Sequence, residues 1–379
     1  MWIDKTEQLE RFCSELEGVP YITVDTEFMR VKTYRPILCL VQVGHGGNGA
    51  VIDVQAPGLS PAPLKKLLLD QSIVKVFHAA SQDLEIFSYL LGEIPTPLFD
   101  TQIAAAFCGL GDQPGYAQLV QTLLRKTIDK SSQNTDWARR PLTSRQVEYA
   151  LGDVTHLCAV YQELQKRLND TGRSAWAQVD FEALGDPEKY RVDPRKAYLR
   201  VKMRRPKRDQ LAILREVAAW REEQAMERDL PRHWVVKDDP LVEIALHAPR
   251  NEKELQRVKN LNLKSRDMGE ILEAVEVARQ LPESEWPELP VRGSKAKADD
   301  SLVALMQALL KLQCERAGIA SRLVASRSDL EEIVLGQGES KALRGWRNDI
   351  FGEAAQSLLR GELGLSGNGT GGVKVLGDF

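Results

Sequence analysis

The segment YITVDTEF, residues 21–28, places two carboxylates at alternate positions directly behind a short run that favours a β-strand. Asp25 and Glu27 are therefore expected to point to the same face of that strand, with their Cα atoms roughly 7 Å apart. Two ionised carboxylates about 4 Å apart repel by roughly 4 kcal/mol at an effective dielectric near 20. The pair favours a cation between them, although one acid facing solvent and the other closing a loop would fit this segment equally well.

A third acid follows the next predicted strand. IVKVF at 73–77 is expected to form a buried strand, and HAA at 78–80 a turn before a helix that Ser81 would cap. Asp83 then falls in the first turn of that helix, just past the carboxyl end of the strand, where α/β sheets place their sites. An acid in a first helical turn can also serve the helix dipole alone.

A tyrosine and a fourth acid lie one turn apart on a later predicted helix. The segment from Ser144 onward keeps apolar residues at helical spacing, and Thr143 or Ser144 can cap it. Tyr149 and Asp153 are four residues apart, so they share one face of that helix, about 6 Å apart along its axis. Asp153 lies beside the expected buried stripe instead of opposite to it, which favours a role in a site over a solvated charge.

These three motifs resemble those of the DEDD exonucleases, in the subgroup with a tyrosine in its third motif. Residues 24–43, VDTEFMRVKTYRPILCLVQV, are similar to the ribonuclease D members of that family. The same similarity extends to LFDTQ at 98–102, IDKS at 128–131, TDW at 135–137 and RPL at 140–142. One departure, Leu151-Gly152 before the last acid, involves no expected ligand.

The resemblance implies a ribonuclease H-like α/β fold and two-metal hydrolysis of phosphodiester bonds. Asp25 would bridge two divalent ions, and Glu27 and Asp153 would complete the shell of the first. Asp83 would serve the second ion through water, and Tyr149 would orient the attacking water. Two ions about 4 Å apart stabilise both the attacking and the leaving oxygen, and all-oxygen ligands suit Mg²⁺ or Mn²⁺.

Three further features have ordinary structural interpretations. GHGGNG at 44–49 formally matches a dinucleotide-binding pattern, but the strand-like AVIDV at 50–54 follows it where that pattern needs a helix, so a hairpin turn is predicted. Asp100 is expected to cap the helix that begins near Thr101 and not to add a fifth ligand. His78 either contacts the substrate or is a hydrogen-bonded turn residue.

Length and composition set the class of protein. A chain of 379 residues predicts two or three domains, and 43% hydrophobic with 28% charged residues is ordinary for a globular protein. The five cysteines are odd in number and contain no CxxC pair, so disulfides and zinc are not expected and a reducing compartment is favoured. No signal sequence and no membrane-spanning apolar run is found, so we expect a cytoplasmic protein.

A basic run interrupts a chain whose formal net charge is −3. Residues 190–208 contain nine basic residues and one acid, Asp193. Such a run either collects RNA phosphates or is a solvated linker. The residues expected to contact RNA, from this run and from the flanks of the acidic motifs, are Phe28, Met29, His78, Arg200, Arg204, Arg205, Lys207 and Arg208.

Changes in composition and in predicted secondary structure divide the chain into six parts. They are an α/β exonuclease domain with a mixed sheet and flanking helices at 1–170, a basic connector at 171–206, a helical domain at 207–286, a linker at 287–299, a second helical domain at 300–362 and a disordered glycine-rich tail at 363–379. Both helical domains resemble HRDC domains. LEEIVL at 330–335 repeats LVEIAL at 241–246 at an offset of 89 residues, and Val324 matches Val235 at the same offset.

Together these features predict a metal-dependent 3′-to-5′ exoribonuclease that releases nucleoside monophosphates, with two divalent ions, Mg²⁺ or Mn²⁺, as cofactors. The resemblance implies that it trims tRNA precursors with 3′ extensions and other structured RNAs, and no membrane or obligate protein partner is expected. A DNA 3′-5′ exonuclease is one alternative, which the flanks around Asp136-Trp137 and the helical domains disfavour. A non-catalytic RNA-binding protein is another, disfavoured because all five site residues are present. A helicase accessory module is disfavoured because no GxxxxGK[ST] loop occurs.

Overall fold

The computed structural model describes residues 1–379 except 130, 134, 262, 290–297, 337–339 and 378–379. Contacts divide the chain into two compact units. The first, which we call the nuclease unit, comprises Met1–Glu27, Leu38–Tyr190 and Ser294–Phe379. The second, which we call the module unit, comprises Phe28–Ile37 and Arg191–Gly293. Among the residues described, no helix is both long and apolar enough to cross a membrane.

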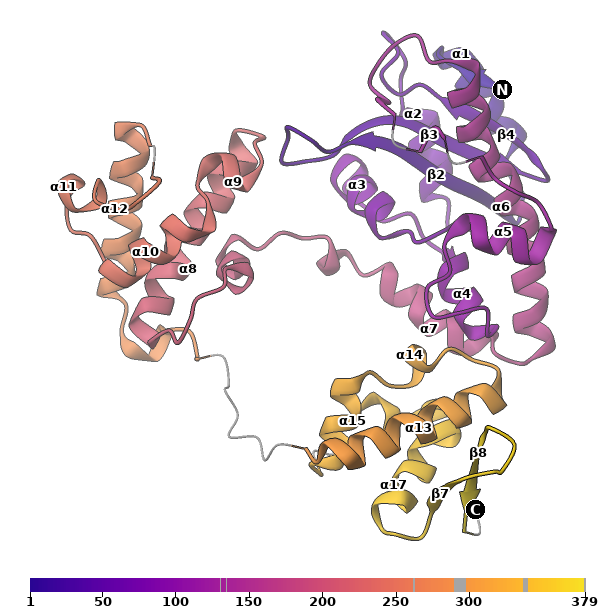
Figure 1. The fold of residues 1–379 in the computed structure, drawn as a ribbon. Coiled ribbons are helices and arrows are strands. Elements are labelled where there is room, and N and C mark those ends of the chain that lie inside the picture. The colour runs from indigo at the N-terminus through magenta and orange to yellow at the C-terminus, as the bar shows by residue number, and fades with distance from the viewer. Residues whose placement is uncertain (130, 134, 262, 290–297, 337–339, 378–379) are drawn as a thin grey trace. The chain divides into compact units, whose positions relative to one another are not determined.

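A six-stranded mixed sheet forms the centre of the nuclease unit, with the strand order β1-β4-β3-β2-β5-β6 (Figure 1). The strands are β1 (Trp2–Ile3), β2 (Tyr21–Met29), β3 (Ile37–His45), β4 (Asn48–Ile52), β5 (Val74–Phe77) and β6 (Leu98–Asp100). β1 is parallel to β4, and β5 is parallel to β2 and to β6, whereas β3 and β4 are antiparallel. The predicted mixed sheet is confirmed.

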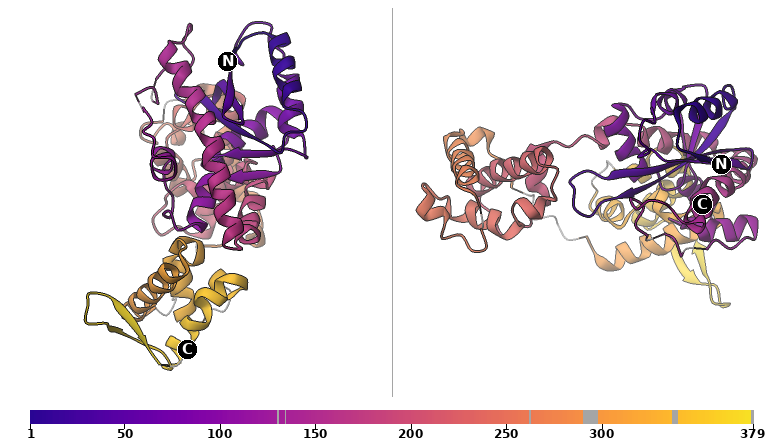
Figure 2. Two further views of the ribbon diagram at one scale, coloured as in Figure 1. Left: turned by 90° about the vertical axis from the view of Figure 1, so that its right-hand side faces the viewer. Right: turned by 90° about the horizontal axis from the view of Figure 1, so that it is seen from above.

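Helices cover both faces of the sheet. One face carries α1 (Thr6–Glu15), α2 (Ala62–Leu69) and α3 (Ser81–Leu91). The other carries α4 (Thr101–Phe107), α5 (Tyr116–Leu124), α6 (Ser144–Asp170) and α7 (Ser174–Leu184). The left view of Figure 2 looks onto α6, which lies across the strands and contacts β4 and β5.

The side chains of β2 alternate between the two cores. Ile22 and Val24 are buried in the core beneath α1, α2 and α3, whereas Tyr21 is buried on the side of α6. Thr23, on the same side as Tyr21, donates a hydrogen bond of 2.9 Å to the carbonyl of Val154. Because side chains alternate along a strand, the same face of β2 continues through its two acids toward α6.

Local signals in the sequence account for several element boundaries. Gly46 and Gly47 form the two-residue turn between β3 and β4 with φ of 59° and 87°, so the predicted hairpin is confirmed. Asp100 caps α4 by accepting from the backbone amides of Gln102 and Ile103, also as expected. Thr143 caps α6 in a capping box, whereas Ser81 does not cap α3. Ala80 stands at that cap position, and its neighbour Ser81 is already helical.

The expected connector at 171–206 divides between the two units. Its first part forms α7, which packs on β6 and buries Ala177 and Phe181, followed by a short helix η1 (Pro187–Lys189). Ala177 and Phe181 are four residues apart, and this apolar spacing makes the segment an amphipathic helix of the nuclease unit. Only the later, basic part belongs to the module unit.

The module unit is a small helical bundle around one long helix. Its helices are η2 (Pro194–Arg200), α8 (Arg208–Glu227), α9 (Arg232–Val235), α10 (Asp238–His247), α11 (Glu252–Leu255), α12 (Ser265–Gln280) and η3 (Glu283–Glu285). α8 is buried on several sides because η2, α10 and α12 all pack against it. The segment Phe28–Ile37, which runs from the end of β2 to the start of β3, inserts Tyr34 into this core with only 7% of its surface exposed.

A second helical bundle belongs to the nuclease unit. It consists of α13 (Asp300–Ala317), α14 (Ser321–Val324), α15 (Arg327–Val334), η4 (Lys341–Leu343), α16 (Gly345–Arg347), the π-helix η5 (Asn348–Gly352) and α17 (Glu353–Leu359). α13, α14 and α15 repeat the long, short and medium helices α8, α9 and α10. Val324 and Val235 end the two short helices and are both buried. The repeated order supports the HRDC-like interpretation of residues 300–362, which stays a prediction.

The tail requires a correction to the expected disorder. Residues 364–376 contain an antiparallel hairpin of β7 (Gly364–Gly367) and β8 (Val373–Leu376). Leu365 and Val375 pair in this hairpin and pack against the core of the second bundle. The alternating apolar side chains favour strands in this segment despite its high glycine content. The expected linker at 287–299 lies largely outside the described residues, at 290–297.

Candidate active site

Three carboxylates converge between β2 and α6. One carboxylate oxygen from each of Asp25, Glu27 and Asp153 lies within 4.8 Å of the other two. Asp25 and Glu27 are on the face of β2 that points to α6, and Asp153 is on α6. The alternation predicted from the sequence therefore brings the two strand acids together with the helix acid.

Two glycines of the β3–β4 hairpin allow α6 to approach the sheet closely enough for this cluster. A Cβ atom at Gly44 would lie 2.6 Å from Thr23 Oγ1 and 3.2 Å from Val154 Cβ. A Cβ atom at Gly49 would lie 3.2 Å from side-chain atoms of both Leu151 and Val154. The close packing fixes the turn of α6 that carries the acid of the third motif.

Asp83 reaches the site from the opposite face of the sheet. It lies in the first turn of α3, is 8% exposed and accepts a hydrogen bond from the hydroxyl of Thr26. Burial raises the pKa of Asp83 well above its ordinary value, and the charge of Asp25 adds to this rise. The charge of Asp83 therefore interacts with that of Asp25. Asp83 is not one of the three acids whose carboxylate oxygens lie within 4.8 Å of one another.

The electrostatics of the cluster favour a bound cation. Burial raises the pKa of Glu27 to about 10, with further contributions from the charges of Asp25, Asp153 and Asp83. Burial also raises the pKa of Asp25, and the charge of Asp153 adds to it. Like charges in one site keep protons bound unless an ion of opposite sign neutralises them. The donors are carboxylate oxygens alone, which fits a hard divalent cation such as Mg²⁺ or Mn²⁺.

Tyr149 stands over the cluster one helical turn before Asp153. Burial raises the pKa of the Tyr149 hydroxyl, and the charges of Asp153 and Glu27 raise it further. The hydroxyl is therefore protonated at neutral pH and can donate a hydrogen bond, as it does to Asp153. The Tyr149 ring packs against that of Trp137, with ring centroids 6.1 Å apart.

An arginine outside the predicted site holds Trp137 in this position. Arg140 donates from Nε and from Nη2 to the carboxylate of Asp53, each at 2.7 Å. Its Nη1 donates to the carbonyl of Trp137 at 2.6 Å, and its Nη2 to the carbonyl of Cys39 at 3.2 Å. Arg140 stands in the RPL motif that supports the family resemblance, but that motif alone did not reveal this role.

His78 is held as part of the fold beside the site. Its Nδ1 lies 3.0 Å from Thr101 Oγ1, whose hydroxyl donates to the carbonyl of Phe77. Its ring packs against that of Tyr116, whose hydroxyl donates to the backbone carbonyl of Asp153 at 2.6 Å. Tyr116 is a site neighbour that the sequence analysis did not identify.

The other residues expected to contact RNA belong to the module unit. Phe28 and Met29 end β2 and are half-buried. Arg208 donates to the carbonyls of Glu283 and Trp286 and to the carboxylate of Glu288, so its guanidinium holds the end of the bundle. The remaining candidates are exposed on the surface of that unit: Arg200, Arg204, Arg205 and Lys207.

Comparisons with known proteins agree with this geometry. Residues 1–169 match a family described as 3′-5′ exonuclease, and residues 210–275 match the HRDC domain. The ribonuclease D of Granulibacter bethesdensis is 42% identical over 97% of this chain and 94% of its own length. That of Zymomonas mobilis is 43% identical over 94% of this chain and 93% of its own length.

Solved structures show the same relationship. The chain is similar to the crystal structure of Escherichia coli RNase D, described as an exoribonuclease involved in structured RNA processing. The TM-score is 0.79 at 32% identity, covering 95% of this chain and 98% of that one. The catalytic core of RRP6 from Trypanosoma brucei is a more distant relative, with a TM-score of 0.55 at 25% identity over 73% of this chain and 79% of that one.

The sheet, the carboxylates and the tyrosine define a metal-dependent 3′-5′ exonuclease with an attached helical domain. Within that class, the chain belongs to the ribonuclease D family. It is accordingly a 3′-5′ exoribonuclease that acts on RNA. The family resemblance, the fold class and the enzyme class expected from the sequence are confirmed.

Proposed function

We propose that this enzyme removes nucleoside monophosphates from the 3′ ends of structured RNAs, and of tRNA precursors with 3′ extensions in particular. The observation that carries the proposal is the convergence of Asp25, Glu27 and Asp153 beneath Tyr149, with Asp83 on the other side of β2. The relative from Escherichia coli is described as acting in structured RNA processing, and the resemblance stated above implies tRNA maturation.

The acids divide naturally between two cation positions. Asp25, Glu27 and Asp153 would hold one divalent ion, and Asp25 with Asp83 would hold the second. Two such ions lower the pKa of a water nucleophile and stabilise the charge that develops on the scissile phosphate. The Thr26 hydroxyl fixes Asp83 by donating to it, so the carboxylate keeps its other lone pairs for the ion.

Tyr149 would orient the attacking water. Its raised pKa keeps the hydroxyl protonated, which suits it to hydrogen bonding and not to proton abstraction. Its hydrogen bond with Asp153 and its packing on Trp137 fix the direction of the hydroxyl. Holding a nucleophile in line with the phosphate supplies part of the rate acceleration.

The helical bundles would hold the body of the RNA while its end enters the site. Structured RNA is bound mostly by its shape and its phosphates. Arg204, Arg205 and Lys207 are exposed and stay candidates for phosphate contacts, with Arg200, Phe28 and Met29. Arg208 is a weaker candidate because its guanidinium is already bonded within the module unit. The cytoplasm stays the proposed location, supported by five cysteines, none of which forms a disulfide.

The substrate is tested by comparing three nucleic acids under the same conditions. A tRNA with a 3′ extension, a single-stranded RNA and a DNA of the same sequence would be offered to the wild-type enzyme with Mg²⁺ or Mn²⁺. The proposal predicts that the extended tRNA is trimmed to a defined end and that the DNA is degraded far more slowly. Equal degradation of RNA and DNA would contradict the proposed substrate.

A further inference from the structure

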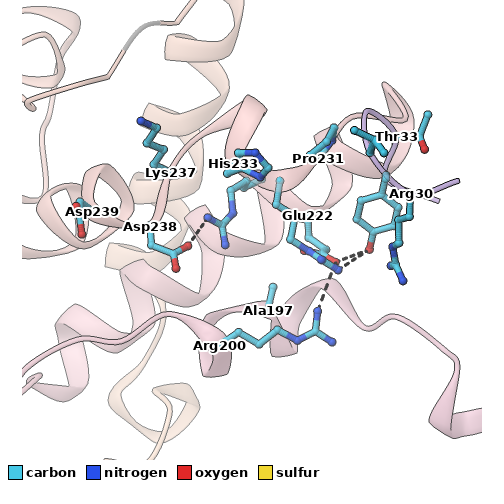
Figure 3. A pocket seen from close by; sticks show the side chains of 14 residues that line it. Arg30, Thr33, Ala197, Arg200, Glu222, Pro231, His233, Lys237, Asp238 and Asp239 are labelled. Carbon is cyan, nitrogen blue, oxygen red and sulfur yellow. Dashed lines mark hydrogen bonds and ion pairs between the residues drawn. The ribbon is translucent and has the colours of Figure 1, made fainter. Parts of the chain in front are cut away.

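The module unit contains a cavity that the nuclease chemistry does not use. Its volume is about 570 Å³, within the range of roughly 300–1,000 Å³ that ligand pockets have. Three segments line it: the loop after β2, the helix η2, and the stretch from α8 to the start of α10. We call it the module pocket; Figure 3 shows the side chains that line it.

Cations outnumber carboxylates among the residues that line the module pocket, which are Arg30, Arg200, Arg221, Arg232 and Lys237 against Glu222, Asp238 and Asp239. The guanidinium groups of Arg200 and Arg232 lie near Glu222 (Figure 3). Glu222 is fully buried and accepts from Arg232 Nη2 at 2.6 Å and from the Tyr34 hydroxyl. Arg200 approaches it only to 3.9 Å, and 64% of the Arg200 side chain is exposed. Glu222 is thus satisfied by other donors, so the Arg200 guanidinium can bind a second anion.

An exposed indole contacts one residue of the pocket lining, His233. His233 lines the module pocket, and the next residue, Trp234, is 53% exposed. Their rings meet edge to face with centroids 6.3 Å apart. Arginines beside an exposed indole are the combination that binds single-stranded nucleic acid, because the cations take the phosphates and the ring stacks on a base. An acidic peptide would use the cations but would leave the indole exposed.

The position of the module pocket in the chain indicates which part of the RNA it meets. Arg30 directly follows β2 and lies three residues after Glu27. Three residues of fully extended chain span at most about 11 Å. Arg30 is therefore close in the chain to an acid of the active site, so the strand whose 3′ end enters that site is the RNA that the module pocket is expected to meet.

We propose that the module pocket binds the phosphodiester backbone of the RNA upstream of the scissile bond, with Arg200 as the phosphate ligand and Trp234 as the stacking platform. The proposal rests on the proposed function, since it assumes that RNA is the substrate. Its ligand chemistry, a nucleotide phosphate, could also come from a free mononucleotide, and the experiment separates the two sources.

The binding experiment uses the full-length Asp25→Asn protein, so that the RNA stays intact, and a fluorescent single strand of about 12 nucleotides. Arg200→Gln and Trp234→Ala are the test variants. Lys196→Gln is the matched control, because Lys196 is on the same helix η2, its side chain is 75% exposed, and it lies outside the module pocket. The affinity is measured over a series of salt concentrations, and calorimetry with AMP tests the free nucleotide.

Arg200→Gln is expected to weaken binding roughly three- to five-fold near physiological salt and to reduce the slope of log K against log salt by about 0.7. Trp234→Ala is expected to weaken binding roughly ten-fold at every salt concentration. Lys196→Gln should leave the affinity and the slope near those of the parent protein. Equal effects of Arg200→Gln and Lys196→Gln would overturn the proposal.

Two further outcomes distinguish a failure of this proposal from a failure of the proposed function. Binding of AMP that Arg200→Gln abolishes, with unchanged RNA affinity, would assign the module pocket to a free nucleotide and overturn the RNA assignment. A wild-type enzyme that cleaves no RNA would contradict the proposed function, while the binding measurements would still decide the module pocket.

Discussion

Arg140 donates two hydrogen bonds of 2.7 Å, from Nε and from Nη2, to the carboxylate of Asp53, which lies 87 residues earlier in the sequence. The pair joins the end of the β3–β4 hairpin to the segment that precedes α6. The same guanidinium donates to the carbonyl of Trp137, whose ring packs against Tyr149. Arg140 is therefore a positioning residue that acts on the site through Trp137 and Tyr149.

Replacing Arg140 with Lys removes the bidentate hydrogen bond to Asp53 but keeps the positive charge. We expect kcat to fall about ten-fold or more with little change in KM, because hydrogen bonds to charged groups contribute about 1.5–3 kcal/mol each. A double-mutant cycle tests whether Arg140 acts on the site through Tyr149. In a Tyr149→Phe background, Arg140→Lys should cost little more, since its effect passes through the missing hydroxyl.

The control for this prediction is Arg145→Lys. Arg145 makes a similar bond to Asp129, but both side chains are largely exposed, at 66% and 60%. Exposed ion pairs contribute little, so kcat should not change. Full additivity of Arg140→Lys and Tyr149→Phe would show that Arg140 serves the fold alone.

The hydroxyl of Thr26 should control the second cation position. Thr26→Val removes its hydrogen bond to buried Asp83 and so raises the pKa of that acid further above its already raised value. We expect the concentration of Mg²⁺ needed for half-maximal activity to rise about ten-fold, with most of kcat recovered at saturating metal. Thr26→Ser keeps the hydroxyl and should behave like the wild type. An unchanged metal requirement in Thr26→Val would refute the link.

Two glycine substitutions near α6 should have opposite effects. Gly44→Ala puts a Cβ atom 2.6 Å from Thr23 Oγ1, so it should push α6 from the sheet, cost about 1–3 kcal/mol of stability and lower activity. Gly152→Ala meets nothing within 4 Å and lies inside a helix, so it should stabilise by about 0.5–1 kcal/mol without loss of activity. Thermal unfolding and an activity assay on both variants provide the measurement, and loss of activity in Gly152→Ala alone would contradict the packing described.

The metal-free protein should lose stability as the pH rises. Burial and like charges raise the pKa of Asp25, Glu27 and Asp83 in the folded state, whereas the unfolded chain keeps ordinary values near 4. Between those values the folded state binds more protons than the unfolded state, so the free energy of unfolding falls with increasing pH. In EDTA, Tm should therefore fall from about pH 5 to about pH 9.

Metal ions should remove this pH dependence. With saturating Mg²⁺ the ions stabilise the ionised carboxylates, so Tm should stay level or rise over the same pH range. Asp25→Asn takes one acid away and should flatten the profile in EDTA. A Tm that rises with pH in EDTA would show that the acids are not held close together.

Strand and helix periodicity predicted which site residues share a face, and the family resemblance brought them into one site. Alternation along β2 aligned Asp25 with Glu27, and the four-residue spacing on α6 aligned Tyr149 with Asp153. Thr26 faces the other side of β2, so nothing in the strand pattern pointed to its bond with Asp83 from α3. That contact depends on how α3 packs on the sheet, which local sequence does not specify.

Contacts between residues distant in sequence account for the other differences. Tyr34 is buried against Glu222, 188 residues away, and the loop sequence gives no sign of it. Arg208 looked like a phosphate ligand in the basic run, but the carbonyls of Glu283 and Trp286 take its hydrogen bonds. The tail formed a hairpin because the bundle offers its apolar residues a surface, and composition alone cannot show such a surface.

The most direct test of the account is digestion of an RNA labelled at its 5′ end, with wild type and Asp25→Asn compared in Mg²⁺, in Mn²⁺ and in EDTA. The account predicts a ladder of products shortened from the 3′ end that requires metal and disappears in Asp25→Asn. Intact RNA in every lane, with the protein still bound to it, would contradict the account and leave an RNA-binding protein without nuclease activity.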